Sequence, residues 1–321
     1  MKYTTHLCLI CGLAAVILLV VWQGAGTVLG LLVTLGWGLL LLPLAWLPHL
    51  LAGTASWRLL FAPCHMPRFL VALRAMWVGG AINLLLPVAS VGGEVVKGRL
   101  VTLDGVDGAQ ASASVTVDLT VQALSLLLWS LVGITALVVL EADRSLALAA
   151  LAGAVLLALG IAGFWRVQRG GAFGFLARLS PKSPLVKSAA AIDQAIHDLY
   201  ARPGRIFLAT LIRLMGRVLL TGEVWLAAWL LGFPVGLLEA LMLKSLTGAL
   251  RGAAFPVPGG LGVQEGGYIV LGALVGYPPD VMLGLSLATR VRELLVSLPA
   301  LFAWQHVEGR ALWQRVTTKS S

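Results

Sequence analysis

Two glutamates stand at matched positions beside glycines, and their carboxylates are the first candidates for chemistry. Glu94 follows Pro87 by seven residues, and Glu265 follows Pro258 by seven residues. Neighbouring glycines allow backbone to approach a ligand closely, and a helix that breaks there offers unpaired N–H and C=O groups. We expect both glutamates to line one central cavity and to act on a polar headgroup or on an ion moved with it.

Polar and basic side chains near these glutamates complete the candidate site. Cations there can pair with the carboxylates and bind a phosphate or hydroxyl-rich headgroup, and arginine suits bidentate contact. The predicted substrate-binding residues are Asn83, Glu94, Lys97, Arg251, Gln264, Glu265, Arg290 and Arg292, and the predicted backbone and hinge residues are Pro87, Gly92, Gly93, Pro258, Gly259, Gly260 and Gly262.

Other charged residues also fall at membrane depth, where an ionised side chain costs roughly 2.5–3.5 kcal/mol. Structural ion pairing is the expected role of a further set, and Glu293 is the expected partner of Arg290 three residues before it. That set is Asp118, Arg213, Arg217 and Glu223.

Signals for catalysis, cofactors or metals are missing from the sequence. It contains no G-x-S-x-G, H-E-x-x-H or P-loop motif. The run Gly259-Gly260-x-Gly262 lacks the strand–turn–helix context of a dinucleotide site. Cys8 and Cys11 form a C-x-x-C inside an apolar stretch without a second pair, which is weak evidence for redox or metal chemistry. We therefore expect no enzymatic activity, no cofactor and no metal.

The elements that must position these residues are membrane-spanning helices. Apolar residues make up 59 % of the 321 residues and charged residues 12 %, whereas an average soluble domain has about 25 % charged residues. Several stretches approach the ~20 apolar residues that cross a bilayer, and such continuous runs differ from the alternating segments of transmembrane strands. The sequence predicts an all-α, polytopic helical membrane protein.

Six full spans and two broken regions are predicted. The broken regions, about 69–103 and 237–276, are interpreted as re-entrant hairpins, because irregular backbone at membrane depth persists only beside protein or a wet cavity. If either hairpin crosses fully, the number of spans rises towards ten. The six spans are about 7–22, 28–50, 113–140, 145–165, 206–231 and 280–304.

The distribution of charge sets the expected orientation. Seven basic and two acidic residues lie between Arg166 and Arg205, and short basic loops stay in the cytoplasm. Both termini are then cytoplasmic. The net charge of +9 is attributed to this bias and to anionic headgroups, so we expect no nucleic-acid partner. Within the loop, 185–200 is predicted as an amphipathic helix on the membrane surface.

The chain is predicted to be a single transmembrane domain, 1–321, with an internal repeat. Its halves, roughly 1–165 and 206–321, are joined by the cytoplasmic basic segment 166–205. The two broken regions then enter from opposite sides, which is typical of an inverted-topology repeat with a substrate site near the midplane. The matching stretch is short, so coincidence is the alternative.

Two segments resemble the signatures of the flippase-like integral membrane family, which includes the transmembrane region of lysylphosphatidylglycerol synthases. They read Asn-Leu-Leu-Leu-Pro-Val-Ala-Ser-Val-Gly-Gly-Glu at 83–94 and Pro-Gly-Gly-Leu-Gly-Val-Gln-Glu at 258–265. The stretches 91–96, 262–268 and 286–295 are most similar to the hopanoid-biosynthesis-associated branch. Many members carry an arginine just after the first proline, where this chain has Val88-Ala89-Ser90, which indicates a different headgroup preference.

The resemblance implies a lipid translocase of the bacterial inner membrane that moves or presents a polar-headed lipid, with a hopanoid or its precursor as a candidate. Membrane lipids and lipid-biosynthesis enzymes are the expected partners. One alternative is a non-transporting scaffold for a lipid-modifying enzyme. Another is a membrane-embedded transferase, for which the sequence offers no nucleophile–base pair. The broken, charge-bearing hairpins favour translocation.

Overall fold

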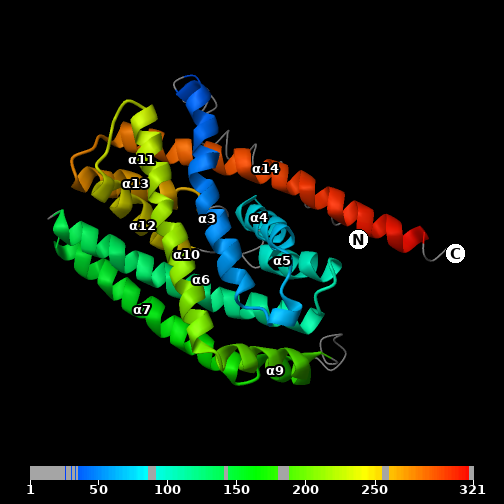
Figure 1. Ribbon diagram of the computed structural model, residues 1–321. Helices are drawn as coiled ribbons and strands as arrows, with labels where there is room; N and C mark the ends of the chain where they lie inside the picture. Colours follow the sequence, from blue (N-terminus) through cyan, green and yellow to red (C-terminus); the bar gives the residue numbers. More distant parts are fainter. Residues whose placement is uncertain are drawn as a thin grey trace.

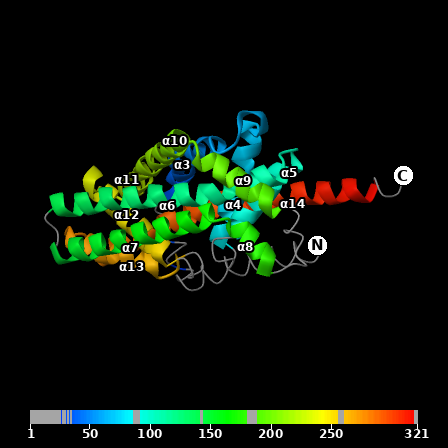
Figure 2. The same ribbon diagram turned by 90° about the horizontal axis from the view of Figure 1, so that it is seen from below.

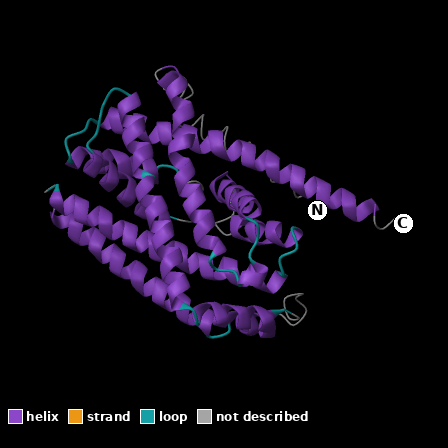
Figure 3. Ribbon diagram, viewed as in Figure 1, coloured by secondary structure: helices purple, strands orange, loops and turns teal. Residues whose placement is uncertain are grey.

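The computed structural model describes residues 35–85, 92–140, 144–179, 188–254 and 260–317, together with Gly26, Gly30 and Val33. Within these ranges all regular elements are helices and no strand occurs (Figure 3). The expected all-α architecture is therefore confirmed. The first predicted span, 7–22, lies outside the described residues, as do Pro87, Pro258 and Gly259.

Three helical segments are long and apolar enough, by length and composition, to cross a membrane. The first joins the 3₁₀ turn η1 (Gly36–Leu40) to α3 (Leu41–Arg58), and the others are α6 (Gly108–Val139) and α7 (Arg144–Arg169). They fall on predicted spans two to four. Helix α7 runs alongside α6 in both views (Figures 1 and 2), with most of its side chains exposed.

Each half of the chain contains a helical hairpin of the same dimensions, in which a 17-residue helix precedes a 12-residue helix. A 12-residue helix is about 18 Å long, which is short of a hydrocarbon core of about 30 Å. In each half a long helix follows. The first half has α4 (Phe69–Leu85), α5 (Gly92–Leu103) and then α6, and the second has α12 (Leu237–Ala253), α13 (Val263–Leu274) and then α14 (Pro279–Thr317).

The two halves pack reciprocally. The short helices lie on the long helix of their own half, α5 on α6 and α13 on α14, whereas the 17-residue helices lie on the long helix of the other half, α4 on α14 and α12 on α6. Helix α10 (Pro203–Leu219) packs along α3; α10 also packs on α6, and α3 packs on α14 (Figure 1). Charged residues of both halves are thereby brought into one interior.

Predicted span five, about 206–231, corresponds to two successive helices. Helix α10 ends at Leu219, and α11 (Thr221–Leu230) begins after Leu220, which keeps helical dihedral angles. The segment is therefore a helix with a break in its hydrogen-bond ladder. The break divides its charged residues, since Arg213 and Arg217 lie before it and Glu223 lies after it.

The predicted amphipathic helix exists as α9 (Ala189–Tyr200), but its apolar face does not lie against lipid. Ile192, Ile196 and Leu199 are buried in a core shared with α4, α5 and α6. Helix α9 also packs on α8 (Ala172–Leu179), where backbone N–H groups of Phe173 and Gly174 donate to the Asp193 carboxylate. The apolar stripe is explained by packing against protein.

A close backbone approach fixes α5 against α4. A Cβ atom added at Gly93 would overlap the carbonyl oxygen of Gly79, and one added at Gly79 would lie 2.8 Å from the carbonyl oxygen of Gly93. The Gly93 N–H also donates to Asn83 Oδ1 at 2.7 Å. The glycines therefore permit a helix contact that positions the first turn of α5, which carries Glu94.

Candidate functional site

The first polar network joins α5, α6 and α10. Lys97 forms ion pairs with Glu94, one turn earlier on α5, and with Asp118 of α6, where its Nζ lies 2.6 Å from Oδ2. The other oxygen of Asp118 accepts from Arg213 Nη2 at 2.5 Å. The Gln122 amide donates to Glu94 and to Asp118. Two cations thus balance two carboxylates inside the protein.

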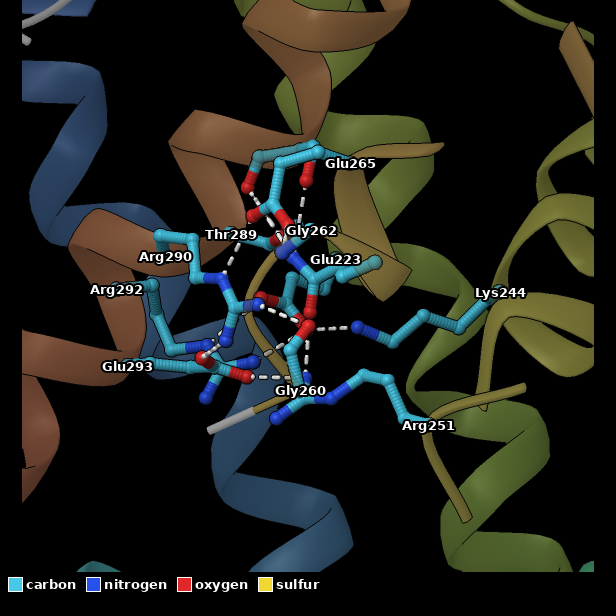
Figure 4. A network of polar contacts seen from close by, with 12 residues as sticks. Glu223, Lys244, Arg251, Gly260, Gly262, Glu265, Thr289, Arg290, Arg292 and Glu293 are labelled. Carbon is cyan, nitrogen blue, oxygen red and sulfur yellow. Dashed lines mark hydrogen bonds and ion pairs between the residues drawn. The ribbon is translucent and has the colours of Figure 1, made fainter. Parts of the chain in front are cut away.

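The second polar network lies around the start of α13 and the first half of α14 (Figure 4). Arg290 Nε lies 3.0 Å from Glu265 Oε1, and Arg290 Nη1 lies 3.1 Å from Glu293 Oε2. Glu293 also accepts from Arg251 of α12 at 2.7 Å, and Arg251 donates to Gln264 Oε1 at 2.5 Å. These contacts tie α12, α13 and α14 together.

Glu223 of α11 forms the third charged cluster. It accepts two hydrogen bonds from Arg292, at 2.7 and 3.0 Å, and one from Lys244 of α12 at 3.1 Å. The bidentate geometry is the strong form of an arginine–carboxylate pair. Glu223 is fully buried, so the cluster fixes Arg292 and Lys244 at the interior.

Glycines shape the N-terminus of α13. Gly260 and Gly262 have φ of +63° and +77°, a region that L side chains rarely adopt. The Gly262 N–H donates to Glu265 Oε2 at 2.8 Å, and the Gly260 carbonyl accepts from Arg290 Nη2 at 3.0 Å. A Cβ atom at Gly260 would lie 3.1 Å from Arg251 Cγ. The turn therefore holds two charged side chains, Glu265 and Arg290, in place and leaves room for a third, Arg251.

Two adjoining cavities open onto these networks. The first cavity has a volume of about 260 Å³ and is lined by polar residues of the first network. The second cavity has a volume of about 320 Å³ and is lined by polar residues of α10, α12 and α13. Both are lined by Trp46 and His49 of α3 and by Arg292 and Glu293 of α14. We call these four residues the shared wall. Apart from the shared wall, the polar lining residues are Asn83, Glu94, Lys97, Gln122, Arg213 and Ser297 in the first cavity and Arg217, Lys244, Thr247, Arg251, Gln264 and Tyr268 in the second.

The structure brings most of the predicted substrate-binding residues to these cavities. Asn83, Glu94 and Lys97 line the first cavity, Arg251 and Gln264 line the second, and Arg292 lines both. Whether they bind substrate stays a prediction.

The expectation that both glutamates line one cavity is not met. Of the described residues lining the two cavities, Glu94 is one and Glu265 is not. The Glu265 carboxylate instead accepts from the Gly262 N–H and from Arg290, which is not among the lining residues of either cavity.

The expected ion pairs of Asp118, Arg213 and Glu223 are confirmed, as is the pair of Arg290 with Glu293. For Arg217 the expectation is wrong within the described residues, where no carboxylate lies within 4.0 Å of its guanidinium. Its guanidinium donates to Ser125 Oγ at 3.0 Å and to the Gln122 carbonyl at 3.5 Å.

Sequence reasoning missed several residues that line the cavities, among them Trp46, His49 and Gln122. Trp46 and His49 lie about one turn apart within an apolar span, and Gln122 follows Asp118 by four residues on α6. A polar side chain inside an apolar span, and a second polar residue one turn from a buried carboxylate, are the signals that point to them. Within the described ranges no group of three or more His, Cys, Asp or Glu side chains is placed to hold a metal ion.

Fold and site together define a polytopic helical membrane protein with a charged interior. The family description "Lysylphosphatidylglycerol synthase TM region" matches residues 9–300, and the chain belongs to this family. Membership supports a membrane location and a function connected with membrane lipids. No curated protein and no solved structure matches the chain.

Proposed function

We propose that this protein is a lipid translocase of the bacterial inner membrane, which moves or presents a polar-headed lipid. The observation that carries the proposal is the pair of polar cavities that meet at the shared wall. A polar headgroup is costly in hydrocarbon, since an unpaired polar or charged group there is disfavoured by several kcal/mol. Charged cavities inside the protein offer such a headgroup a polar path.

The reciprocal packing supports a path that involves both halves. The first cavity takes Glu94 and Lys97 from α5, and the second takes Arg251 and Gln264 from α12 and α13. Arg292 contributes to both cavities and is held by Glu223. In the proposed mechanism the headgroup moves from the charged residues of one cavity to those of the other. Arg292, which lines both cavities, stays in contact with the headgroup during this transfer.

We further propose that the two hairpins are re-entrant and enter from opposite faces. The short lengths of α5 and α13 support this arrangement, because neither is long enough to cross the hydrocarbon core alone. The family is connected with membrane lipids, and the stretches 91–96 and 262–268 favour a hopanoid or its precursor as the lipid.

The proposal is tested by reconstitution into liposomes and a labelled-lipid scrambling assay. Gly248 lines the second cavity, and a Cβ atom added there would meet no heavy atom within 4 Å. Gly248→Leu therefore fills the cavity without removing any charge, and we expect translocation to fall at least tenfold. Gly160→Leu on α7, where the space is also open, is the matched control and should translocate like wild type.

A scaffold that does not transport lipid predicts a different result. Wild-type protein would then give no scrambling above empty liposomes, and Gly248→Leu would change nothing. Either a silent wild type or a fully active Gly248→Leu variant contradicts the proposed translocase.

A further inference from the structure

We infer that the second cavity binds a phosphate group and that Arg217 is the residue that binds it. This inference rests on the proposed function, because it names the headgroup chemistry that such a translocase would handle, and it favours a phosphate-bearing lipid over a hopanoid without phosphate. It is carried by the balance of charge in the cavity wall, by the partners of Arg217, and by two buried hydroxyl groups.

The wall of the second cavity carries more positive than negative charge. Four cations, Arg217, Lys244, Arg251 and Arg292, line it together with one carboxylate, Glu293. Glu223, which lies behind the wall, is shared by Lys244 and Arg292, and Glu293 is shared by Arg251 and Arg290. The cavity therefore offers an excess of positive charge to an occupant.

Arg217 differs from its neighbour Arg213, one turn earlier on α10. Arg213 donates to the buried carboxylate of Asp118 at 2.5 Å. Arg217 donates to neutral oxygens, Ser125 Oγ and the Gln122 carbonyl, and among the described residues it meets no carboxylate at ion-pair distance. A guanidinium has five N–H donors, so most of those of Arg217 remain for a ligand.

Two hydroxyl groups in the same wall also point to a polar ligand. Tyr268 and Thr247 line the second cavity with 1 % and 2 % of their surface exposed. Among the described residues neither hydroxyl has a hydrogen-bond partner. Because buried hydroxyl groups are rarely left unsatisfied, a polar occupant in this cavity accounts for them. A tetrahedral anion accepts hydrogen bonds from several directions and suits such donors.

A phosphate group can come from a lipid headgroup or from free phosphate, and the experiment separates the two. Protein purified in a neutral detergent is titrated with phosphatidylglycerol, with diacylglycerol as the phosphate-free lipid, and with inorganic phosphate. The readout is the midpoint of thermal unfolding, which rises when a ligand binds the native state. The variants are Arg217→Gln, Arg217→Lys and, as the control, Arg166→Gln at an exposed position of α7.

We expect phosphatidylglycerol to raise the midpoint and diacylglycerol to leave it unchanged. Arg217→Gln should weaken the apparent affinity at least about tenfold, because charge-assisted hydrogen bonds are the strong ones. Arg217→Lys should keep part of it, and Arg166→Gln all of it. A response to inorganic phosphate that also depends on Arg217 supports the site and shows that the phosphate group alone suffices for binding. A response to phosphatidylglycerol that Arg217→Gln leaves intact, or equal responses to both lipids, overturns the inference.

Failure of this inference is distinguishable from failure of the proposed function. If wild type binds phosphatidylglycerol through Arg217 but scrambles no lipid, the anion site stands and translocation fails. If wild type and Arg217→Gln scramble labelled phosphatidylglycerol equally well, translocation stands and the role of Arg217 fails.

Discussion

Glu94 and Glu265 occupy the same place in two helices of the same length: each is the third residue of a 12-residue helix that follows a break. Each carboxylate lies against a cation, but the two cations come from different places. Lys97, the partner of Glu94, is on the same helix, whereas Arg290, the partner of Glu265, is on the following long helix. The repeat therefore keeps the position of the carboxylate while its pairing differs.

Removing the charge of either glutamate should cost less stability than removing that of Asp118. In Glu94→Gln and Glu265→Gln the cation keeps a second carboxylate, Asp118 for Lys97 and Glu293 for Arg290, so we expect a loss of about 1.5–3 kcal/mol. Asp118→Asn leaves Arg213 without its carboxylate, which should cost about 3–5 kcal/mol. Thermal unfolding of the three purified variants checks the order.

The two glutamate variants also distinguish a role of Glu94 and Glu265 in translocation from a purely structural role. We expect Glu94→Gln and Glu265→Gln to insert and purify while lipid translocation falls sharply, because Glu94 lines the first cavity and Glu265 holds Arg290, the partner of the lining residue Glu293. Full activity would remove both glutamates from the site. Activity that falls only in proportion to stability would assign them to the scaffold.

The glycine contact between α4 and α5 predicts that alanine has opposite effects on stability at Gly93, which lies in the contact, and at Gly80, which does not. Gly93→Ala forces a methyl group onto the Gly79 carbonyl, and overpacking against backbone should cost about 3 kcal/mol. At Gly80 a Cβ atom meets nothing within 4 Å, so Gly80→Ala should be neutral or stabilise the helix by about 0.5–1 kcal/mol. Equal unfolding midpoints for the two variants would contradict the described packing.

Glycine is required at the turn before α13. Gly260→Val and Gly262→Val place a β-branched residue at positive φ, where even an ordinary side chain costs roughly 1–2 kcal/mol, and Val at 260 also presses on Arg251. We expect both variants to lose stability and translocation, and we expect the same of Gly259→Val from the sequence. Gly266→Ala, inside α13 with open space around it, is the control. Normal expression and activity of all three valine variants would contradict the broken-hairpin interpretation.

The orientation of the chain is tested by labelling. In a background with Cys8, Cys11 and Cys64 replaced by serine, a cysteine at Ser188 should be protected from impermeant thiol reagents in intact cells, because the basic segment 166–205 is expected inside. A cysteine at Ala142 should react. The reverse pattern would invert the predicted topology and remove the support for opposite entry of the hairpins.

Sequence predicted the helical class and the places where helices break, because apolar runs and Gly/Pro interruptions are local properties of the chain. It also placed Glu94 and Glu265 beside glycines at these breaks, and the structure shows that a 12-residue helix begins at each of them. The partners of the charged residues could not be assigned in this way. Arg213 and Asp118 are 95 residues apart, and only the packing of α10 on α6 brings them together.

Three further features of the structure could not be predicted from the sequence. The apolar stripe of Ile192 and Ile196 fits equally well against lipid or against protein, and only the tertiary structure shows that it packs against protein. The break at Leu220 falls in an apolar run without proline, so its sequence carries no strong stop signal. The cavities were missed in part because Trp46 and His49 of α3 meet Arg292 and Glu293 of α14 only when distant helices are assembled.

The reciprocal packing of the halves has a consequence for biogenesis. Helix α4 ends at Leu85, and α14, which covers it, begins at Pro279, so at synthesis rates of about 5–20 residues per second the ribosome supplies that cover roughly 10–40 s later. Arg213, which pairs with Asp118, is also translated later than Asp118. Until then Lys97, which precedes Asp118 in the chain, is the cation that can neutralise it. We therefore expect the newly made first half to depend on an insertase or chaperone, which protects its uncovered surface until α14 has been translated.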